Sequence, residues 1–182
     1  EYQGRRVQVT PKPFSPGGPG LVMGGNSEIA ARRAARFGMG MISQGSNPAI
    51  SEIYAAECRK LGREPGFCAN PPADTVTAAF FAEDPDRAWR ELGPYLLHDA
   101  RAYADWMGES HVSASKSSAG SIEELRAQGS PYCIFTPDEA VAYVRRRRLL
   151  ALQPLCGGLP PALAWPSLEL LASKVLPALA TP

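Results

Sequence analysis

The sequence predicts an α/β fold of four consecutive β/α units with a parallel sheet, which amounts to half of a TIM (β/α)8 barrel. Short apolar segments of strand length alternate with longer segments that have helical periodicity. Such alternation implies parallel strands joined by right-handed crossovers. The chain has 182 residues, whereas complete barrels usually need ~250. An open doubly wound sheet is the structural alternative, because periodicity does not show whether a sheet closes.

The first two units follow an extended N-terminal segment, residues 1–20, that is rich in Pro and Gly. Residues 21–25 are predicted to form the first strand and 28–37 its helix. Residues 39–44 are predicted to form the second strand. The helix that follows spans about 47–61, because an Asn-Pro pair supplies an N-cap and a first helical residue. Residues 21–182 are therefore expected to form the barrel half.

The third unit begins at residues 75–82, which are β-branched and aromatic enough for a strand. Asp84 and Pro85 start a long helix that runs to about Trp106. Residues 108–120 are rich in Ser, Ala and Gly and are expected to form a flexible insertion. The Ser-x-x-Glu pattern at 121–124 is a capping box that starts a short helix.

The fourth unit contains a second capping box, Thr-Pro-Asp-Glu at 136–139, which opens a helix ending in an arginine run. Residues 149–154 are predicted to form the fourth strand. Pro166 is expected to mark the start of the final helix or a kink in it. One apolar stripe of this helix comprises Leu168, Leu171, Val175, Leu176 and Leu179.

The most informative feature is the turn between the first strand and its helix. Gly24 and Gly25 allow the backbone to approach a ligand closely. Asn26 and Ser27 are favoured N-cap residues whose side chains can donate to phosphate oxygens. The helix that opens at Glu28 directs its free N–H groups and the positive end of its dipole at the same place. The pattern predicts an anion site, although many turns use these residue types only to reverse the chain and cap a helix.

Composition excludes several classes of protein. The net charge is +1, so no bulk charge indicates nucleic acid or a membrane surface as partner. No apolar run approaches the ~18 residues of a membrane span, and no signal peptide is visible. Arg145 to Arg148 end a helix, where cations complement the dipole. We expect a cytoplasmic protein, from a processed or excised chain because it begins with Glu1.

The cysteines form no C-x-x-C pair, and only two histidines could join them as metal ligands. Buried, reduced thiols are therefore favoured over a disulfide framework or a zinc site, and no metal is expected. The cysteines are Cys58, Cys68, Cys133 and Cys156.

Several motifs in order along nearly the whole chain resemble the C-terminal half of the bacterial-luciferase-like family of flavin-dependent oxidoreductases and monooxygenases. The first are the Val-Thr-Pro-Lys-Pro segment at 9–13 and the Gly-Gly-Asn-Ser turn, with the Ala- and Arg-rich helix after it. Later matches are Phe-Ala-Glu-Asp-Pro-Asp-Arg-Ala-Trp at 81–89, Thr-Pro-Asp-Glu-Ala at 136–140 and Leu-Gln-Pro-Leu-Cys-Gly-Gly-Leu-Pro at 152–160. No single motif is decisive, but their order is.

The resemblance implies FMN, or a deazaflavin relative of it, at the carboxyl ends of the strands. The implied cofactor-binding residues are Gly24, Gly25, Asn26, Ser27, Ala30, Ser43 and Gln44. Ala30 would line the phosphate pocket, where some relatives carry a hydroxyl residue, so the phosphate would depend more on backbone amides. Ser43 and Gln44 would approach the flavin ring; the alternative is that they are ordinary polar residues at a strand end.

In the resembling family, the acid and base groups lie mostly in the N-terminal half of the barrel, so this chain alone is expected to be inactive. His98, beside Asp99, is the weak catalytic candidate, because its pKa range suits proton transfer. Adjacent helical residues do not face each other, so an outward or structural histidine is the alternative. His111 could belong to a lid or be a solvated loop residue.

Two classes of function remain open. One is the C-terminal part of a flavin-dependent enzyme that acts on a small-molecule substrate, and the other is a non-catalytic half-barrel that serves binding or assembly. A half barrel exposes an apolar inner face and two strand edges, so a homo-oligomer is expected. The tryptophans Trp89, Trp106 and Trp165 are predicted to pack within the fold rather than stack on the flavin.

Overall fold

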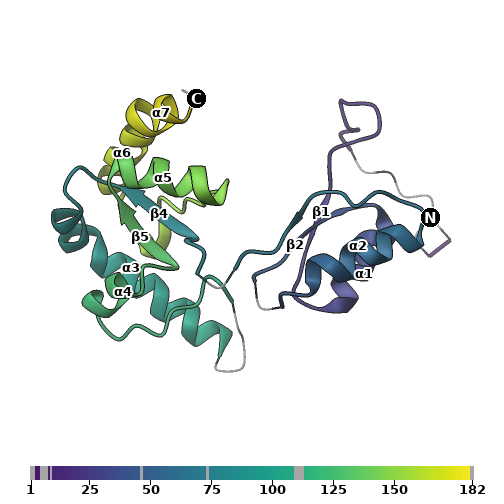
Figure 1. Cartoon of the computed structure of the whole chain (residues 1–182), viewed down its shortest axis with the longest axis horizontal. Coiled ribbons are helices and arrows are strands. Elements are labelled where there is room, and N and C mark those ends of the chain that lie inside the picture. The colour runs from purple at the N-terminus through teal and green to yellow at the C-terminus, as the bar shows by residue number, and fades with distance from the viewer. Residues whose placement is uncertain are drawn as a thin grey trace. The chain divides into compact units, whose positions relative to one another are not determined.

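The computed structural model describes residues 3–4, 8, 10–45, 47–72, 74–108 and 113–180. The chain divides into two compact units (Figure 1). Unit 1 contains Glu1–Ile42 and Ala49–Ala69, and unit 2 contains Ser43–Pro48 and Asn70–Pro182.

Unit 1 is built on a three-stranded parallel sheet in the order β1-β2-β3. The strands are β1 (Val22–Gly24), β2 (Gly40–Ile42) and β3 (Cys68–Ala69). The predicted strands 21–25 and 39–44 are thus confirmed in shortened form. We did not predict β3, because two residues are too short to show an alternating pattern.

Two helices cover one face of this sheet and lie side by side (Figure 1). They are α1 (Glu28–Phe37), whose bounds match the prediction, and α2 (Ile50–Lys60), which begins later than predicted. Side chains alternate between the faces of a strand, so Met41 packs on the helices whereas Val22 and Ile42 point the other way. Val22 and Ile42 remain 47% and 46% exposed, so the second face of the sheet is open and apolar.

Unit 2 contains a parallel pair, β4 (Ala78–Phe81) and β5 (Tyr132–Phe135). Strand β4 lies within the predicted segment 75–82, but β5 was not predicted. The predicted strand at 149–154 is reduced to one parallel bridge between Leu152 and Ala79. Our expectation of four adjacent strands in one sheet was therefore wrong for the part of the chain that the structure describes.

Helices cover both faces of the β4–β5 pair. On one face, Ala78 and Phe80 pack in a core with residues of α3 (Pro85–Met107), α4 (Ile122–Gln128) and α6 (Pro161–Leu170). On the other face, Ala79 and Phe81 pack against α5 (Pro137–Arg147) and the end of the chain. A half barrel would carry all its helices on the outer face of the sheet, so the prediction of one-sided helices that follows from it was wrong for unit 2.

The physical reason is strand order. Strand β4 pairs with β5 and also forms the bridge to Leu152. The chain therefore crosses over once from β4 to β5 and a second time from β5 back to β4. Right-handed crossovers in opposite directions place their helices on opposite faces of a sheet. The mixed α/β class with parallel sheets is thus confirmed, and unit 2 has the helix placement of the doubly wound alternative.

The final helix is continuous over three segments: α6, a π-helical turn η2 (Leu171–Val175) and α7 (Leu176–Ala180). It begins at Pro161, and Pro166 lies inside it rather than at its start. Val175 is buried as predicted, but Leu176 is 53% exposed. A π-helical turn contains more residues than an α-helical turn. The residues after it therefore face a different direction than an uninterrupted α-helix would give them, and the predicted apolar stripe ends there.

The described part of the Ser-rich segment, residues 113–120, packs against the rest of unit 2, and the flexibility expected for 108–120 stays a prediction. Four of its residues are buried: Ser113, Ala114, Ser117 and Ala119. The Ser117 hydroxyl donates a hydrogen bond of 2.7 Å to the side-chain oxygen of Gln128. His111, the other part of this prediction, lies outside the described residues.

All four cysteines are free, and Cys58 is the most buried of them. Burial raises the pKa of the Cys133 thiol to about 11 and, with the nearby Asp99 carboxylate, that of Cys156 to about 12. Among the described residues, none of the His, Cys, Asp and Glu side chains gather in a group able to hold a metal ion. No described helix is long and apolar enough to span a membrane.

Candidate functional site

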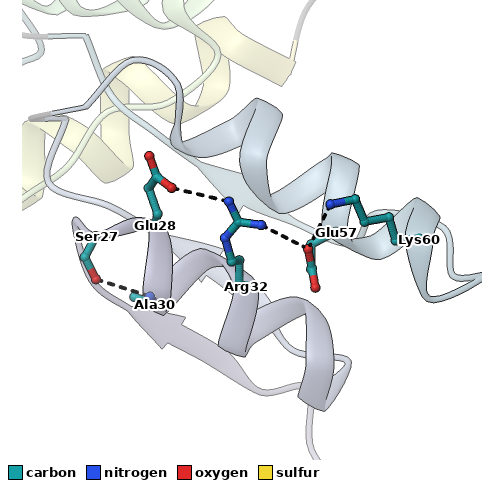
Figure 2. Close-up of polar contacts among 6 residues, drawn as sticks. All are labelled: Ser27, Glu28, Ala30, Arg32, Glu57 and Lys60. Carbon is teal, nitrogen blue, oxygen red and sulfur yellow. Dashed lines mark hydrogen bonds and ion pairs between the residues drawn. The ribbon is translucent and has the colours of Figure 1, made fainter.

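The Gly24–Ser27 turn carries β1 into α1, and its last residue is the N-cap of the helix. The Ser27 hydroxyl oxygen accepts a hydrogen bond of 3.2 Å from the amide of Ala30 (Figure 2). The Ser27 carbonyl accepts a second one, of 3.1 Å, from the amide of Ala31. The capping half of the prediction is therefore confirmed in atomic detail.

The cap leaves helix-start donors that can serve an anion. The amides of Glu28 and Ile29 occupy the first helical positions, which have no carbonyl partner within a helix. They lie at the positive end of the dipole of α1. Ser27 is exposed, so solvent and ligands reach this end of the helix.

The two glycines have different roles. The Gly25 amide donates a hydrogen bond of 3.0 Å to the carbonyl of Ile42 in the neighbouring strand. A Cβ atom on Gly25 would lie 2.7 Å from the Ala30 Cβ, so glycine is needed here to pack on the helix. A Cβ atom on Gly24 would meet no other atom within 4 Å. Gly24 is therefore the residue that borders open space, and Gly25 and Ala30 are mutually fitted packing residues.

Charged side chains follow the cap along the helix (Figure 2). Arg32 pairs with Glu28 one turn before it, at 3.3 Å, and with Glu57 on α2, at 3.4 Å. Lys60 extends the chain of charges at 3.7 Å from Glu57. The Glu28 carboxylate lies close to the helix start, where it would repel an anion, and the Arg32 cation offsets that charge.

Ser43 and Gln44 directly follow β2, as predicted for residues at a strand end, and belong to a polar cluster in unit 2. The buried Ser43 hydroxyl donates to the side-chain oxygen of Asn70, and it accepts a 3.1 Å hydrogen bond from the Gly45 amide. The Asn70 amide nitrogen in turn donates to the carbonyl of Asn47 at 3.0 Å. Ser43 thus holds the loop together.

Gln44 is the exposed residue of the pair. Its side-chain amide nitrogen donates a hydrogen bond of 3.4 Å to the hydroxyl of Tyr103. Its backbone carbonyl accepts a hydrogen bond of 2.7 Å from the Ala114 amide. We name the group of Ser43, Gln44, Asn70 and Tyr103 the strand-end cluster. Asn70 and Tyr103 were not among the predicted site residues. Asn70 directly follows β3, and this position would have indicated it if the sequence pattern of β3 were long enough to recognise.

His98 does not pair with the acid beside it. Its side chain is exposed, whereas the two carboxylate oxygens of Asp99 accept hydrogen bonds from Tyr132, at 2.7 Å, and from the Gly157 amide, at 2.9 Å. Asp99 and burial together raise the pKa of Tyr132. The structure therefore favours the outward histidine that we held as the alternative.

Three residues of the arginine run contact groups of their own unit. Arg145 donates to the Ala178 carbonyl at 3.1 Å, and Arg147 forms an ion pair with Asp74. The guanidinium of Arg146 lies 5.7 Å from the centre of the Tyr143 ring.

The three tryptophans differ in burial. Trp89 is buried in the core as predicted, with 5% of its surface exposed. Trp106 and Trp165 are 82% and 60% exposed, so the prediction that they pack within the fold was wrong.

The residues present fit a phosphorylated cofactor at the Gly24–Ser27 turn. The helix start is exposed, and the first amides of a helix have no carbonyl partner within the helix. The space next to Gly24, which a side chain would fill, leaves room for the ligand. No cation lies in the turn itself, so backbone amides would carry most of the phosphate binding.

Comparison with known proteins gives one clear result. A family model described as luciferase-like monooxygenase matches residues 1–146, which is most of the chain. No curated protein matched the sequence. The matched range includes the Gly24–Ser27 turn and the whole strand-end cluster. The chain therefore belongs to the luciferase-like monooxygenase family.

Proposed function

We propose that this chain is the C-terminal part of a flavin-dependent oxidoreductase or monooxygenase, and that the Gly24–Ser27 turn binds the phosphate of FMN or of a deazaflavin. The observation that carries the proposal is the capped, exposed start of α1 beside the open space at Gly24. Family membership supports the redox class of the reaction.

In this proposal the chain's own residues bind and orient. The amides at the start of α1 would hold the phosphate through charge-assisted hydrogen bonds. Within unit 1, Gly25 and Ala30 would keep the strand end and the helix start in place. Within unit 2, Ser43 would hold its own loop, and Gln44 is the residue proposed to offer its amide to the flavin ring. A bound flavin supplies the hydride or oxygen chemistry, because the reactive atoms belong to the cofactor. A small-molecule substrate completes the reaction.

The sharpest test uses the difference between the two glycines. Gly24→Val adds a side chain into open space, so it should leave the fold intact and weaken FMN binding at least about tenfold, equal to 1.4 kcal/mol. Ser27→Ala should remove the cap, weaken binding less and lower the free energy of unfolding by about 0.5–2 kcal/mol. Calorimetric titration of FMN and of the phosphorylated deazaflavin measures both variants.

Gly20→Val is the matched control, because the same substitution there also meets no atom within 4 Å. It should bind FMN like the wild type. Gly25→Val is unsuitable, because its clash with Ala30 would unsettle the fold itself. If Gly24→Val and Ser27→Ala both bind FMN as tightly as the wild type, the turn only caps the helix.

The second candidate function is assembly without catalysis, and the open apolar face of the unit 1 sheet favours it. Val22 and Ile42 on that face are about half exposed, an arrangement typical of a surface that binds a partner. Under this function the chain forms a homo-oligomer and binds no flavin. The FMN titration separates the two candidates, since only the enzyme part requires the cofactor.

A further inference from the structure

A groove of about 330 Å³ lies between α3 and α6, at the carboxyl end of β4. All of its lining residues belong to unit 2. Most of the lining is apolar: Phe81, Ala88 and Leu92 are buried, and Leu163 and Leu170 are partly buried. The volume is at the small end of the ~300–1,000 Å³ typical of small-molecule sites.

Ser167 is the one uncharged polar side chain among the residues that line this groove, and only 4% of it is exposed. Its hydroxyl oxygen accepts a hydrogen bond of 2.8 Å from the amide of Phe81, the last residue of β4. A serine hydroxyl can also donate a hydrogen bond. Among the residues that the structure describes, this proton has no acceptor. Buried polar groups normally have hydrogen-bond partners, so an acceptor on a ligand would complete the bonding of Ser167.

The charged residues of the groove are exposed and lie at its rim. Three are carboxylates, Glu83, Asp84 and Glu91, and one is a cation, Arg87. Arg87 is paired with Glu91 at 2.8 Å, and Lys174 is paired with Glu83. The rim therefore has more acids than bases, and its lining cation is already paired. An anionic ligand would be repelled here and would find no cation of its own.

We infer that this groove binds a small, neutral, apolar molecule with one hydrogen-bond acceptor, such as a medium-chain ketone, and that the Ser167 hydroxyl donates to that acceptor. The hydrocarbon part would be buried against Leu92 and Leu163, because apolar surface is stabilised when it leaves water. The absence of charge on the ligand avoids repulsion by the carboxylates at the rim. This inference does not depend on flavin binding.

The test compares two probes of equal chain length, 2-octanone and octanoate, by calorimetric titration. The ketone should bind at least about tenfold more tightly than octanoate, because a carboxylate loses hydration when it enters an apolar groove with an acidic rim. If octanoate binds as tightly as the ketone, or if the ketone does not bind, the inference is overturned.

Ala162→Phe locates the binding in the groove. Ala162 is an exposed lining residue, so the larger side chain should occupy the groove without disturbing the core and should weaken 2-octanone binding at least about tenfold. Ala172→Phe is the matched control, because Ala172 is also exposed, lies further along the same continuous helix and does not line the groove. It should bind the ketone like the wild type. Wild-type affinity in Ala162→Phe would mean that the ketone binds elsewhere.

Ser167→Ala tests the hydrogen bond and should weaken 2-octanone binding about threefold to tenfold. The infrared carbonyl band of ¹³C-labelled 2-octanone should lie at lower frequency when bound to the wild type than when bound to Ser167→Ala. This variant also removes the acceptor of the Phe81 amide, so its unfolding curve is measured beside its binding. If the bound carbonyl band is the same in both proteins, Ser167 is not the donor and the inference fails. The FMN titrations decide the phosphate turn separately.

Discussion

The two units of this chain cover their sheets in different ways. Unit 1 has helices on one face of a three-stranded sheet and leaves the other face open, whereas both faces of the strand pair in unit 2 are covered. A contiguous exposed apolar patch is typical of a surface that binds a partner. The comparison shows that unit 2 covers both faces of its own strand pair, whereas unit 1 leaves apolar side chains of one sheet face exposed.

The interiors of the two units differ as well. The core of unit 1 packs three alanines of α1, Ala31, Ala34 and Ala35, against a few larger side chains such as Met41 and Ile50, and the ion pair between Arg32 and Glu57 joins its two helices. The core of unit 2 has large side chains such as Phe80 and Leu96, which are fully buried. Among the described residues, unit 2 has three clusters of buried residues and unit 1 has one, so we expect most of the stability to reside in unit 2, whereas the proposed phosphate turn lies in unit 1.

The largest effect should come from Phe80→Ala, which empties the centre of the unit 2 core. We expect it to lower the free energy of unfolding by about 3–5 kcal/mol in denaturant titrations. Hydrogen exchange should show the loss of amide protection in unit 2 and little change in unit 1. Phe14→Ala, at a fully exposed phenylalanine, is the control. Equal loss of protection in both units would show one cooperative fold and break the comparison.

A smaller effect should follow from Val22→Lys, which places a charge on the open face of unit 1. If a second copy of the chain covers this face, each lost valine contact should weaken association by about 1.5–3 kcal/mol. Light scattering at micromolar concentration should then show a shift from oligomer to single chain. Leu176→Lys, on an exposed position of unit 2, should leave the mass unchanged. A wild-type mass equal to one chain would contradict self-association.

The smallest effect should come from Arg32→Ala, which removes the ion pairs from α1 to Glu28 and Glu57. The Arg32 side chain is 48% exposed, so water and salt screen these pairs. We expect the free energy of unfolding to fall by about 0.2–1 kcal/mol, and the difference to shrink at high salt. Arg33→Ala, at the next exposed position, is the control. A loss above about 2 kcal/mol would contradict the expectation that water and salt screen these exposed pairs.

The local elements with strong chemical signals were predicted well. Ser27 caps α1, and Thr136 and Glu139 form the reciprocal capping box at the start of α5. Asp84 caps α3, as the Asp-Pro pair indicated. In each of these caps the two interacting residues are only three or four positions apart, so both can be recognised in one short stretch of sequence.

Strands and strand ends were predicted less well. The two-residue β3 has no periodicity to detect, and β5 was overlooked between two well-marked helices. For the same reason Asn70 was not predicted as a site residue. Its position at a strand end is evident only when β3 is seen to pair with β2. Tyr103 joins Gln44 from 59 positions away, a distance that no local pattern spans.

By itself, the sequence determined the α/β class, the starts of α1, α3, α4 and α5, and the capped turn before α1, because capping and periodicity are local properties of the chain. Only the tertiary structure decided that the strands form two sheets and that helices lie on both faces of one of them. It also decided that Gly25 is small because Ala30 packs on it, and that Trp106 is exposed while Trp89 is buried. These outcomes depend on which distant segments pair and pack, and such contacts are set by the fold as a whole.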